Sequence, residues 1–280
     1  MVLREANMNA AVEEHYTHRD LTKAIREALQ RAGKDPAHLQ PTDLAAVDEF
    51  HIRGRQATLE LANWIKPTAA DRVLDIGSGL GGASRTLAAT YGCHVTGIDL
   101  TEAYCRTARD LAEWVGLGER VTYQQANALD LPFPDGSFDI AWTQHVAMNI
   151  PDKATLYREA YRVLKPGGVF ALYDVLQGPS GEVIFPVPWA REPSISHLIT
   201  PQDLRSLLEQ AGFEVEHWQD TTAAGRDWFI GMDRCLQENG PPPVSFVLLM
   251  GSEFKEMAAN QRRNLEENRI ALIETVCRRR

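Results

Sequence analysis

Apolar residues recur at helical spacing in the first quarter of the chain. One series covers residues 21–29 and a second covers residues 58–65, where Pro67 closes the pattern. Both series have the three-and-four spacing that places apolar side chains on one face of a helix. We therefore predict a helical cap over residues 1–70.

Short apolar runs alternate with helical stretches from residue 71 to about residue 175. The runs cover residues 72–76, 94–99, 121–124, 138–143 and 169–173, and we expect one helix between each run and the next. Continuously apolar runs are typical of a parallel sheet that is buried on both faces and joined by right-handed crossovers. The pattern predicts an α/β fold, and an open sheet of this kind binds ligands beyond the carboxyl ends of its strands.

The rest of the chain has a less regular pattern. Residues 176–200 contain four prolines, which is typical of a functional lid or of a poorly ordered loop. A helix after Thr200 and a strand over 213–216 come next, followed by two helices around three consecutive prolines. Residues 269–277 fit either a last strand or the end of a long helix. We assign residues 71–280 to one domain with insertions at 176–200 and 220–262.

Composition excludes several classes of protein. Of the 280 residues, 44% are hydrophobic and 24% are charged, and the net charge is −9. These values disfavour global disorder and binding to nucleic-acid phosphates. No stretch approaches the ~20 apolar residues that span a bilayer, residues 1–20 are too polar for a signal peptide, and the four cysteines lack metal-ligand or redox spacing. We expect a cytoplasmic protein with no metal, no nucleic-acid partner and no membrane segment.

The segment Val-Leu-Asp-Ile-Gly-Ser-Gly-Leu-Gly-Gly after residue 72 is the most informative part of the sequence. Gly77, Gly79 and Gly82 match the dinucleotide pattern GxGxxG, which is a weak signal on its own. Gly77, Gly79 and Gly81 match GxGxG instead, with Asp75 two residues before the first glycine. A carboxylate at the strand tip disfavours a pyrophosphate and favours a cation such as an ammonium or a sulfonium. These residue types favour a cationic ligand above the glycine loop.

Asp99 ends the second apolar run, 22 residues after Gly77. An acidic residue at this point accepts hydrogen bonds from both ribose hydroxyls in either kind of nucleoside site. Asp99 therefore predicts a nucleoside ligand without choosing between a dinucleotide and another nucleoside.

The motifs at residues 73–82, 99, 128–139 and 164–168 together resemble those of Rossmann-like S-adenosylmethionine-dependent methyltransferases. They look most like the small-molecule group that includes the ubiquinone/menaquinone and sarcosine/dimethylglycine methyltransferases, as does the stretch Asp-Glu-Phe-His-Ile-Arg-Gly-Arg that begins at residue 48. The resemblance implies a seven-stranded, mostly parallel sheet with helices on both faces and an antiparallel last strand. It also implies S-adenosylmethionine as the cofactor, but it does not specify the methyl acceptor.

The resemblance further implies roles by position. It assigns the methionine part of the cofactor to Asp75 and to the loop that contains Gly77, Ser78, Gly79 and Gly81. It assigns the ribose and adenine side to Asp99 and Leu100, places Ala128 against the adenine and lets Gln144 close the floor of the site. Relatives usually carry aspartate where this chain has Asn127, whose amide oxygen still accepts a hydrogen bond from the adenine amino group, but without charge.

Methyl transfer is an in-line displacement in which the cofactor supplies the electrophile. The protein has to align the acceptor atom with the methyl group, exclude water and, where required, remove a proton. His145, after the fourth predicted strand, is the preferred base, because an imidazole titrates near neutral pH; a structural histidine is the alternative. Met148 and Asn149 follow it as acceptor contacts, and His51 and His197 are second choices for the base.

The proline-rich stretch at 185–191 is interpreted as a lid that faces the acceptor. Trp189 is expected to stack on a ring or to face a cation, with loop anchoring as the alternative. Arg191 is expected to bind a carboxylate or a phosphate. Tyr16 is a candidate for covering the cofactor.

The sequence predicts N- or O-methylation of a small organic acceptor and leaves C-methylation open. An NAD(P)-dependent oxidoreductase built on GxGxxG is one alternative, against which Asp75 counts. A non-catalytic protein that binds the cofactor is the other alternative. A homodimer is compatible with the sequence, which does not decide the oligomeric state.

Overall fold

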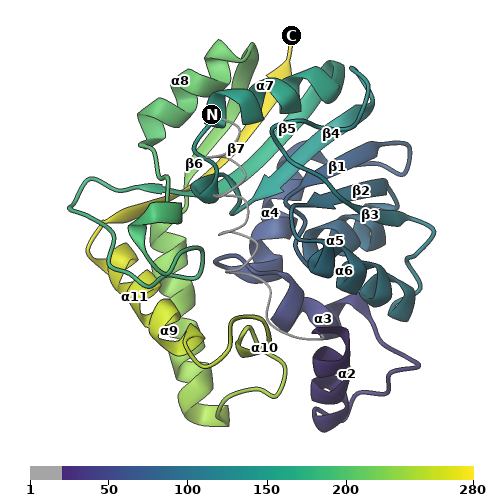
Figure 1. The fold of residues 1–280 in the computed structure, drawn as a ribbon, viewed down its shortest axis with the longest axis vertical. Helices are drawn as coiled ribbons and strands as arrows, with labels where there is room; N and C mark the ends of the chain where they lie inside the picture. The colour runs from purple at the N-terminus through teal and green to yellow at the C-terminus, as the bar shows by residue number, and fades with distance from the viewer. Residues whose placement is uncertain (1–20) are drawn as a thin grey trace.

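A single sheet of seven strands organises the computed structural model, which describes residues 21–280 (Figure 1). The strand order is β3-β2-β1-β4-β5-β7-β6. Neighbouring strands from β3 to β5 pair in parallel, whereas β7 is antiparallel to both β5 and β6. The predicted mostly parallel sheet is confirmed, and so is the strand alternative for the end of the chain. The strands are β1 (Arg72–Ile76), β2 (His94–Asp99), β3 (Val121–Gln125), β4 (Phe138–Gln144), β5 (Leu164–Gln177), β6 (Phe213–Asp220) and β7 (Ile270–Arg279).

Helices cover both faces of this sheet and extend beyond its edge. The α-helices are α2 (Leu21–Arg31), α3 (Pro41–Asp48), α4 (Gly54–Ile65), α5 (Gly82–Tyr91), α6 (Glu102–Trp114), α7 (Lys153–Val163), α8 (Pro201–Gln210), α9 (Thr222–Asn239), α10 (Val247–Met250) and α11 (Phe254–Glu266). Two short 3-10 helices are η1 (Ala147–Asn149) and η2 (Pro193–Ile195). In Figure 1 the sheet fills the upper half of the view, while α2, α3 and α9–α11 lie in the lower half.

Alternate residues of the strands enter two separate cores, which is why the strands are apolar on both sides. Val73 packs in the core that contains the apolar faces of α4, α5 and α6. Leu74, the next residue, packs in the core that contains those of α7 and α8. A third cluster joins α2, α3, α10 and α11 to α6. The sheet is therefore covered on both faces, and its carboxyl-terminal edge is where a ligand site can form.

The structure corrects three expectations about single elements. No helix separates β3 from β4, so the expected regular alternation is wrong at that point. The short helix α3 was not predicted, because only three of its eight residues are buried and they give no clear helical stripe. Residues 176–200 are not irregular throughout, since β5 continues to Gln177 and η2 interrupts the loop.

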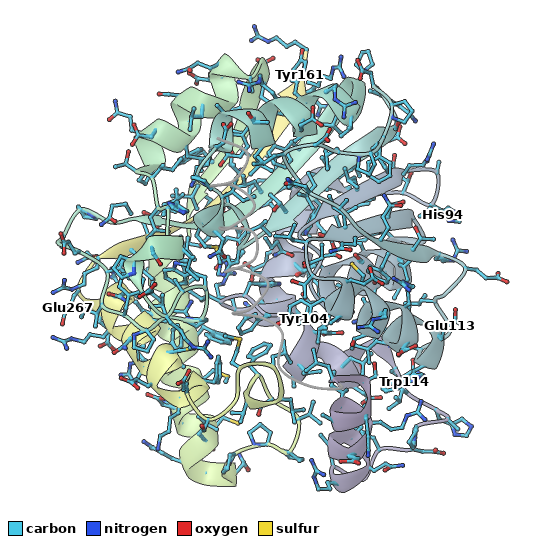
Figure 2. The ribbon with its side chains drawn as sticks, viewed as in Figure 1. His94, Tyr104, Glu113, Trp114, Tyr161 and Glu267 are labelled. Carbon is cyan, nitrogen blue, oxygen red and sulfur yellow. The ribbon has the colours of Figure 1, made fainter. Side chains whose placement is uncertain are left out.

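The last strand is held in place from two directions. At its end, the Arg279 guanidinium lies over the ring of Tyr161 in α7, 4.6 Å from the ring centroid; Tyr161 is labelled near the top of Figure 2. In its middle, the buried Glu274 carboxylate accepts a hydrogen bond of 2.8 Å from Arg53, just before α4. Arg53 also pairs with Glu60. The contact between residues 53 and 274 ties the segment before β1 to the strand that completes the sheet.

Replacing Arg53 with methionine leaves the Glu274 carboxylate buried without its charged partner. We expect Arg53→Met to lower the free energy of unfolding by about 3–5 kcal/mol, because an uncompensated buried charge is strongly destabilising. Arg109→Met is the control, since Arg109 and Glu102 are both more than 40% exposed and a surface pair contributes ~1 kcal/mol or less. Urea denaturation measures both variants, and similar small losses would contradict the structural role of Arg53.

Candidate active site

The glycine loop between β1 and α5 leaves space for a ligand at its tip. Gly77, Gly79 and Gly81 all have φ between 54° and 78°, a conformation that favours glycine. A Cβ atom on Gly81 would lie 2.2 Å from the Tyr123 hydroxyl, whereas one on Gly79 would meet nothing within 4 Å. The loop is therefore packed against the protein at Gly81 and open at Gly79, where a ligand can approach the backbone.

Asp75 is buried at the end of β1 and lines the pocket beside this loop. Its Oδ2 accepts a hydrogen bond of 2.6 Å from Ser84 Oγ. Burial raises the pKa of Asp75 to about 7 against the lowering effect of Ser84, and the negative charges of Glu49 and Asp99 raise it further. A carboxylate in this environment is stabilised when a cation binds next to it.

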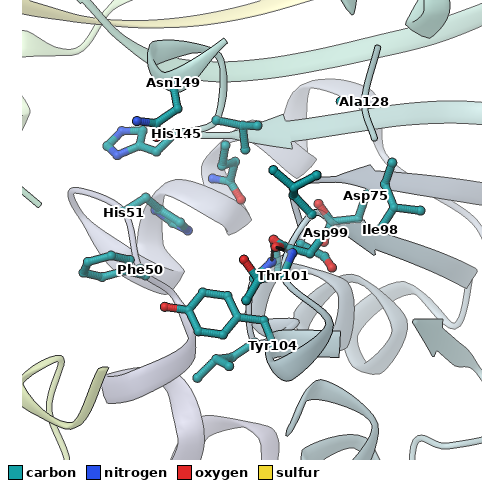
Figure 3. Close-up of a pocket in the computed structure, with 18 of the residues that line it drawn as sticks. Phe50, His51, Asp75, Ile98, Asp99, Thr101, Tyr104, Ala128, His145 and Asn149 are labelled. Carbon is teal, nitrogen blue, oxygen red and sulfur yellow. Dashed lines mark hydrogen bonds between the residues drawn. The ribbon is translucent and has the colours of Figure 1, made fainter. Parts of the chain in front are cut away.

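Asp99 at the end of β2 holds the loops on both sides of it. Its Oδ2 accepts a hydrogen bond of 2.9 Å from the Gly79 amide, and its Oδ1 accepts one of 2.9 Å from the Thr101 amide. Leu100 and Ser78 line the same pocket, and the Ser78 hydroxyl has no hydrogen-bond partner among residues 21–280. Figure 3 shows Asp75 and Asp99 on one side of the pocket and Phe50 and His51 on the other.

The loop after β3 supplies Asn127 and Ala128 to the same pocket. The Asn127 amide oxygen accepts a hydrogen bond of 2.9 Å from the Leu129 amide, which fixes the turn. A carbonyl oxygen has two lone pairs, so this bond leaves one for a ligand.

Gln144 ends β4 with its amide orientation fixed. Its Oε1 accepts a hydrogen bond of 3.0 Å from the Trp142 indole and lies 3.0 Å from Thr58 Oγ1, whose single proton is closer to Glu49. Because an indole nitrogen only donates, the amide oxygen must face Trp142. The Gln144 Nε2 group has no partner among the described residues, so its two N–H groups are available to a ligand in the pocket.

A second, larger cavity of about 830 Å³ adjoins the first pocket. Its wall is mainly apolar, with aromatic side chains from several segments. Three residues line both spaces: Phe50, His51 and His145. A ligand in one space and a ligand in the other would therefore meet at these three side chains.

The segment before α4 brings buried charges to the junction of the two spaces. The Glu49 carboxylate is 1% exposed and accepts hydrogen bonds from Thr86 Oγ1 at 2.6 Å, from Thr58 Oγ1 at 2.7 Å and from His51 Nε2 at 3.0 Å. Sequence reasoning missed Glu49. No local pattern marks Glu49, because its hydroxyl partners lie on the two helices that follow it in the chain.

His145 follows Gln144 and takes a backbone conformation with φ of 52°. Its ring lies 5.8 Å from that of His51, between ring centroids. Burial holds the pKa of His145 well below its usual value, and the charge of His51 acts in the same direction. The His145 Nε2 atom has no hydrogen-bond partner within residues 21–280.

The structure separates the remaining acceptor-contact predictions into two groups. Met148 and Trp189 line the second cavity, and Asn149 lines the first pocket while its Nδ2 donates to the Trp189 carbonyl at 2.8 Å. Trp189 is 1% exposed and its indole donates to Ser196. The same side chain therefore anchors the lid loop and lines the second cavity.

Arg191 and His197 line neither space, and the geometry does not support their predicted contacts with the acceptor. Arg191 pairs with Glu253 at 3.0 Å on a largely exposed surface. His197 uses its backbone to hold Met148 and Lys153. Tyr16, the candidate cover for the cofactor, lies outside the described residues. Within the described part of the chain, no group of three His, Cys, Asp or Glu side chains is placed to hold a metal, and no helix is both long and apolar enough to cross a membrane.

Comparison with known proteins identifies methyltransferases. A family model described as a methyltransferase domain matches residues 74–172. The chain is 34% identical to 27-O-demethylrifamycin SV methyltransferase of Amycolatopsis mediterranei over 63% of its own length and 66% of the relative's. It is 30% identical to methyltransferase GfsG of Streptomyces halstedii over 66% and 67%, and 35% identical to a sarcosine/dimethylglycine N-methyltransferase of Halorhodospira halochloris over 54% of each chain. The match thus spans about half to two thirds of these relatives.

The fold is also similar to that of solved structures. Phosphoethanolamine N-methyltransferase 2 of Haemonchus contortus, in complex with S-adenosylmethionine, superposes with a TM-score of 0.71 at 18% identity. The superposition covers 91% of this chain and 60% of the other chain. At 18% identity this similarity shows a shared fold and nothing more specific.

The raised pKa of Asp75 makes the binding of a cationic ligand dependent on pH. We expect the affinity for S-adenosylhomocysteine, whose amino-acid part carries an ammonium group, to rise as the pH rises towards about 7 and then to level off. Below that pH the carboxyl group is largely protonated in the free protein and must release its proton on binding. Calorimetry at pH 6 in buffers of different ionisation enthalpy should detect this release. Asp75→Asn, which cannot ionise at that position, should bind more weakly and release less; identical proton release in both proteins would contradict the assignment.

Proposed function

The chain belongs to the S-adenosylmethionine-dependent methyltransferases, and we propose that it methylates an oxygen or nitrogen atom of a predominantly apolar small molecule. The observation that carries this proposal is the adjoining pair of spaces. The cavity of about 830 Å³ lies next to the pocket of the glycine loop, and Phe50, His51 and His145 line both. A cofactor in the first and an acceptor in the second would meet at that junction.

The residues of the first pocket fit S-adenosylmethionine. Asp75 would accept from the ammonium group of its methionine part, and the open side of the loop at Gly79 leaves room for the backbone to approach it. Asp99 and Leu100 would bind the ribose, Asn127 and Ala128 the adenine. The unpartnered Gln144 Nε2 group offers two donors to the floor of the site. When bound, the cofactor supplies an electrophilic methyl group.

The size and the lining of the second cavity support a bulky apolar acceptor. Cavities of about 300–1,000 Å³ with a mostly apolar wall are typical for ligands of drug or natural-product size. A small zwitterion such as an amino acid would leave most of this space to water, against the need to exclude water from the reacting atoms. The net charge of −9 supports a small molecule rather than a nucleic acid as the partner.

The lining of the cavity supports the predicted division of the chain. Residues 50–52 of the proposed N-terminal cap, residues 188–189 of the lid and residues 228–266 of the last helices contribute to its wall. In this arrangement the cap and the two insertions enclose the acceptor, while the sheet carries the cofactor.

The protein's own contribution to the reaction is positioning and the exclusion of water. Aligning an acceptor atom with a reactive group contributes about 7–11 kcal/mol in well-organised sites. Of the three side chains at the junction, His51 is buried, while Phe50 and His145 are partly buried. A non-catalytic protein with this fold would bind the cofactor without turnover, so an acceptor screen separates it from the proposed enzyme.

Asp99→Ala tests the nucleoside site. We expect it to weaken the binding of S-adenosylhomocysteine by about 10-fold to 100-fold, because charge-assisted hydrogen bonds contribute about 1.5–3 kcal/mol and Asp99 also holds the Gly79 amide. Asp130→Ala is the control, since Asp130 is exposed and lies outside both spaces. Calorimetry with NADH runs in parallel. Unchanged affinity in Asp99→Ala, or NADH binding in place of S-adenosylhomocysteine, would remove the support for this cofactor.

Ala258→Trp tests the acceptor cavity. Ala258 lies on α11 and lines only the second cavity, so a large side chain there should fill part of it. We expect turnover of acceptors found in a screen of apolar phenols, alcohols and amines to fall for the bulkiest members first. The affinity for S-adenosylhomocysteine should stay that of the wild type. Ala223→Trp, at an exposed position of α9 outside both spaces, is the matched control; equal effects of both variants would count against the cavity as the acceptor site.

A further inference from the structure

Three side-chain amides near the middle of α11 differ in what they bind. Asn260 Nδ2 donates to the Pro186 carbonyl at 3.0 Å, and Asn264 binds the backbone N–H and carbonyl of Ile184 at 2.9 Å and 3.0 Å. These two amides tie the lid loop to the helix. Gln261 lies between them, is 7% exposed and lines the second cavity. Its amide takes part in no hydrogen bond in the described part of the chain.

A buried amide without a partner is unusual and unfavourable. Buried polar side chains are hydrogen-bonded in most native structures, and an unmet donor or acceptor lowers the stability of the fold. The rest of the cavity wall is mainly apolar, so a leucine at position 261 would match its surroundings better than a glutamine. A residue that breaks a local rule of folding in this way is typical of a functional site.

The position of Gln261 on α11 brings it to the side of the helix that faces the junction. Gln261 and Leu265 are four residues apart and therefore share one face of the helix. Leu265 packs in the same core as Ile52, and a Cβ atom on Gly225 would lie within 3.7 Å of both side chains. Ile52 follows the junction residue His51 and lines the second cavity itself. An acceptor that extends from the junction into the cavity therefore has this face of α11 beside it.

We propose that Gln261 is a specificity-determining residue, whose amide binds an uncharged carbonyl or hydroxyl group of the acceptor at a point separate from the methylated atom. This inference rests on the proposed function and narrows its class of acceptor. A glutamine amide both donates and accepts, so it pairs with either group. The acceptor is then an apolar scaffold with the methylated atom at the junction and a second, neutral polar group further into the cavity.

The charges around the cavity disfavour a carboxylate or an ammonium group at this point. Burial of either ion without an opposite charge has a large desolvation cost. Arg262 already pairs with Asp233 and Glu266, and these three side chains are 36–47% exposed. None of the Asp, Glu, Lys and Arg side chains that line the cavity is buried; they are Asp233, Lys255, Arg262, Arg263 and Glu266. A neutral group is therefore the match for the neutral amide.

The buried amide also selects against acceptors that are apolar throughout. The cavity of about 830 Å³ has room for water that satisfies the amide in the free protein. An acceptor that fills the cavity displaces this water. A hydrocarbon surface then leaves the amide unpaired, whereas a carbonyl or hydroxyl group replaces the lost hydrogen bond. Sites that hydrogen-bond a substrate group discriminate strongly against analogues that lack it, so Gln261 adds a chemical requirement to the shape of the cavity.

Three ligands with one carbon skeleton test this contact without turnover. They are fluorene, 9-fluorenone and 9-hydroxyfluorene, each used to displace the fluorescent probe N-phenyl-1-naphthylamine in the presence of S-adenosylhomocysteine. A wholly apolar site prefers fluorene, because it buries the most apolar surface. We expect the wild-type protein to bind 9-fluorenone, 9-hydroxyfluorene or both more tightly than fluorene. Gln261→Leu should lower this preference by about tenfold, as for the loss of one hydrogen bond to a buried group.

The stability of the same variant separates recognition of the acceptor from a role in the fold. Gln261→Leu removes an unpaired buried amide, so it should keep or raise the midpoint of urea denaturation. Gln237→Leu is the matched control, since Gln237 is exposed on α9 and lines neither space; it should change neither the ligand preference nor the midpoint. A clear fall in the midpoint for Gln261→Leu alone would show that the amide stabilises the fold and would overturn the inference.

The remaining outcomes distinguish this inference from the proposed function. Tightest binding of fluorene by the wild-type protein, or the same preference in Gln261→Leu as in the wild type, would overturn the polar contact and leave the methyltransferase function intact. Displacement of the probe by none of the three ligands would contradict the apolar acceptor cavity and the inference with it. Failure to bind S-adenosylhomocysteine in calorimetry would instead contradict the proposed function.

Discussion

Three charged side chains between residues 48 and 53 are buried, and each needs a partner from another part of the fold. Asp48 pairs with Arg85 of α5 at 2.5 Å, Glu49 accepts hydrogen bonds from α4 and α5, and Arg53 pairs with Glu274 of β7. An unpaired charge at any of these points would cost several kcal/mol. Because all three partners must be met together, the segment has a single position on the sheet, and the residues between them are fixed at the junction of the two spaces.

The same constraint creates an excess of negative charge where the carboxyl ends of the strands meet. Burial raises the pKa of Asp75 to about 7 against the lowering effect of Ser84, and the negative charges of Glu49 and Asp99 raise it further. Hydrogen bonds reduce this repulsion, since Asp99 is held by backbone amides and Asp75 by Ser84. A ligand that brings a positive charge removes what remains. The free protein is thus preorganised for a cationic ligand at the expense of its own electrostatic energy.

Local signals were enough to predict the sheet and the residues that line the pocket at the glycine loop. A short apolar run that ends in glycines, with Asp75 inside it, encodes the loop and its carboxylate within ten residues. Glu49 could not be identified in this way, because its partner Thr86 is 37 residues away and no periodicity links the two. For the same reason Arg191 was expected to face the acceptor: its partner, Glu253, is 62 residues further along the chain. The positions of Glu49 and Arg191 thus depend on partners that are distant in the sequence, which residue type alone does not reveal.

Different parts of the chain line the first pocket and the second cavity. Loops after β1, β2, β3 and β4 build the first pocket, so its shape follows from the sheet itself. Much of the wall of the second cavity comes from residues 228–266, which can change without moving the ends of the strands. With cofactor and acceptor in the two spaces as proposed, the methyl group would cross at the junction, where Phe50, His51 and His145 line both. His51 is one of them and is held by the buried Glu49 carboxylate, so the wall of the second cavity can vary while the junction keeps its geometry.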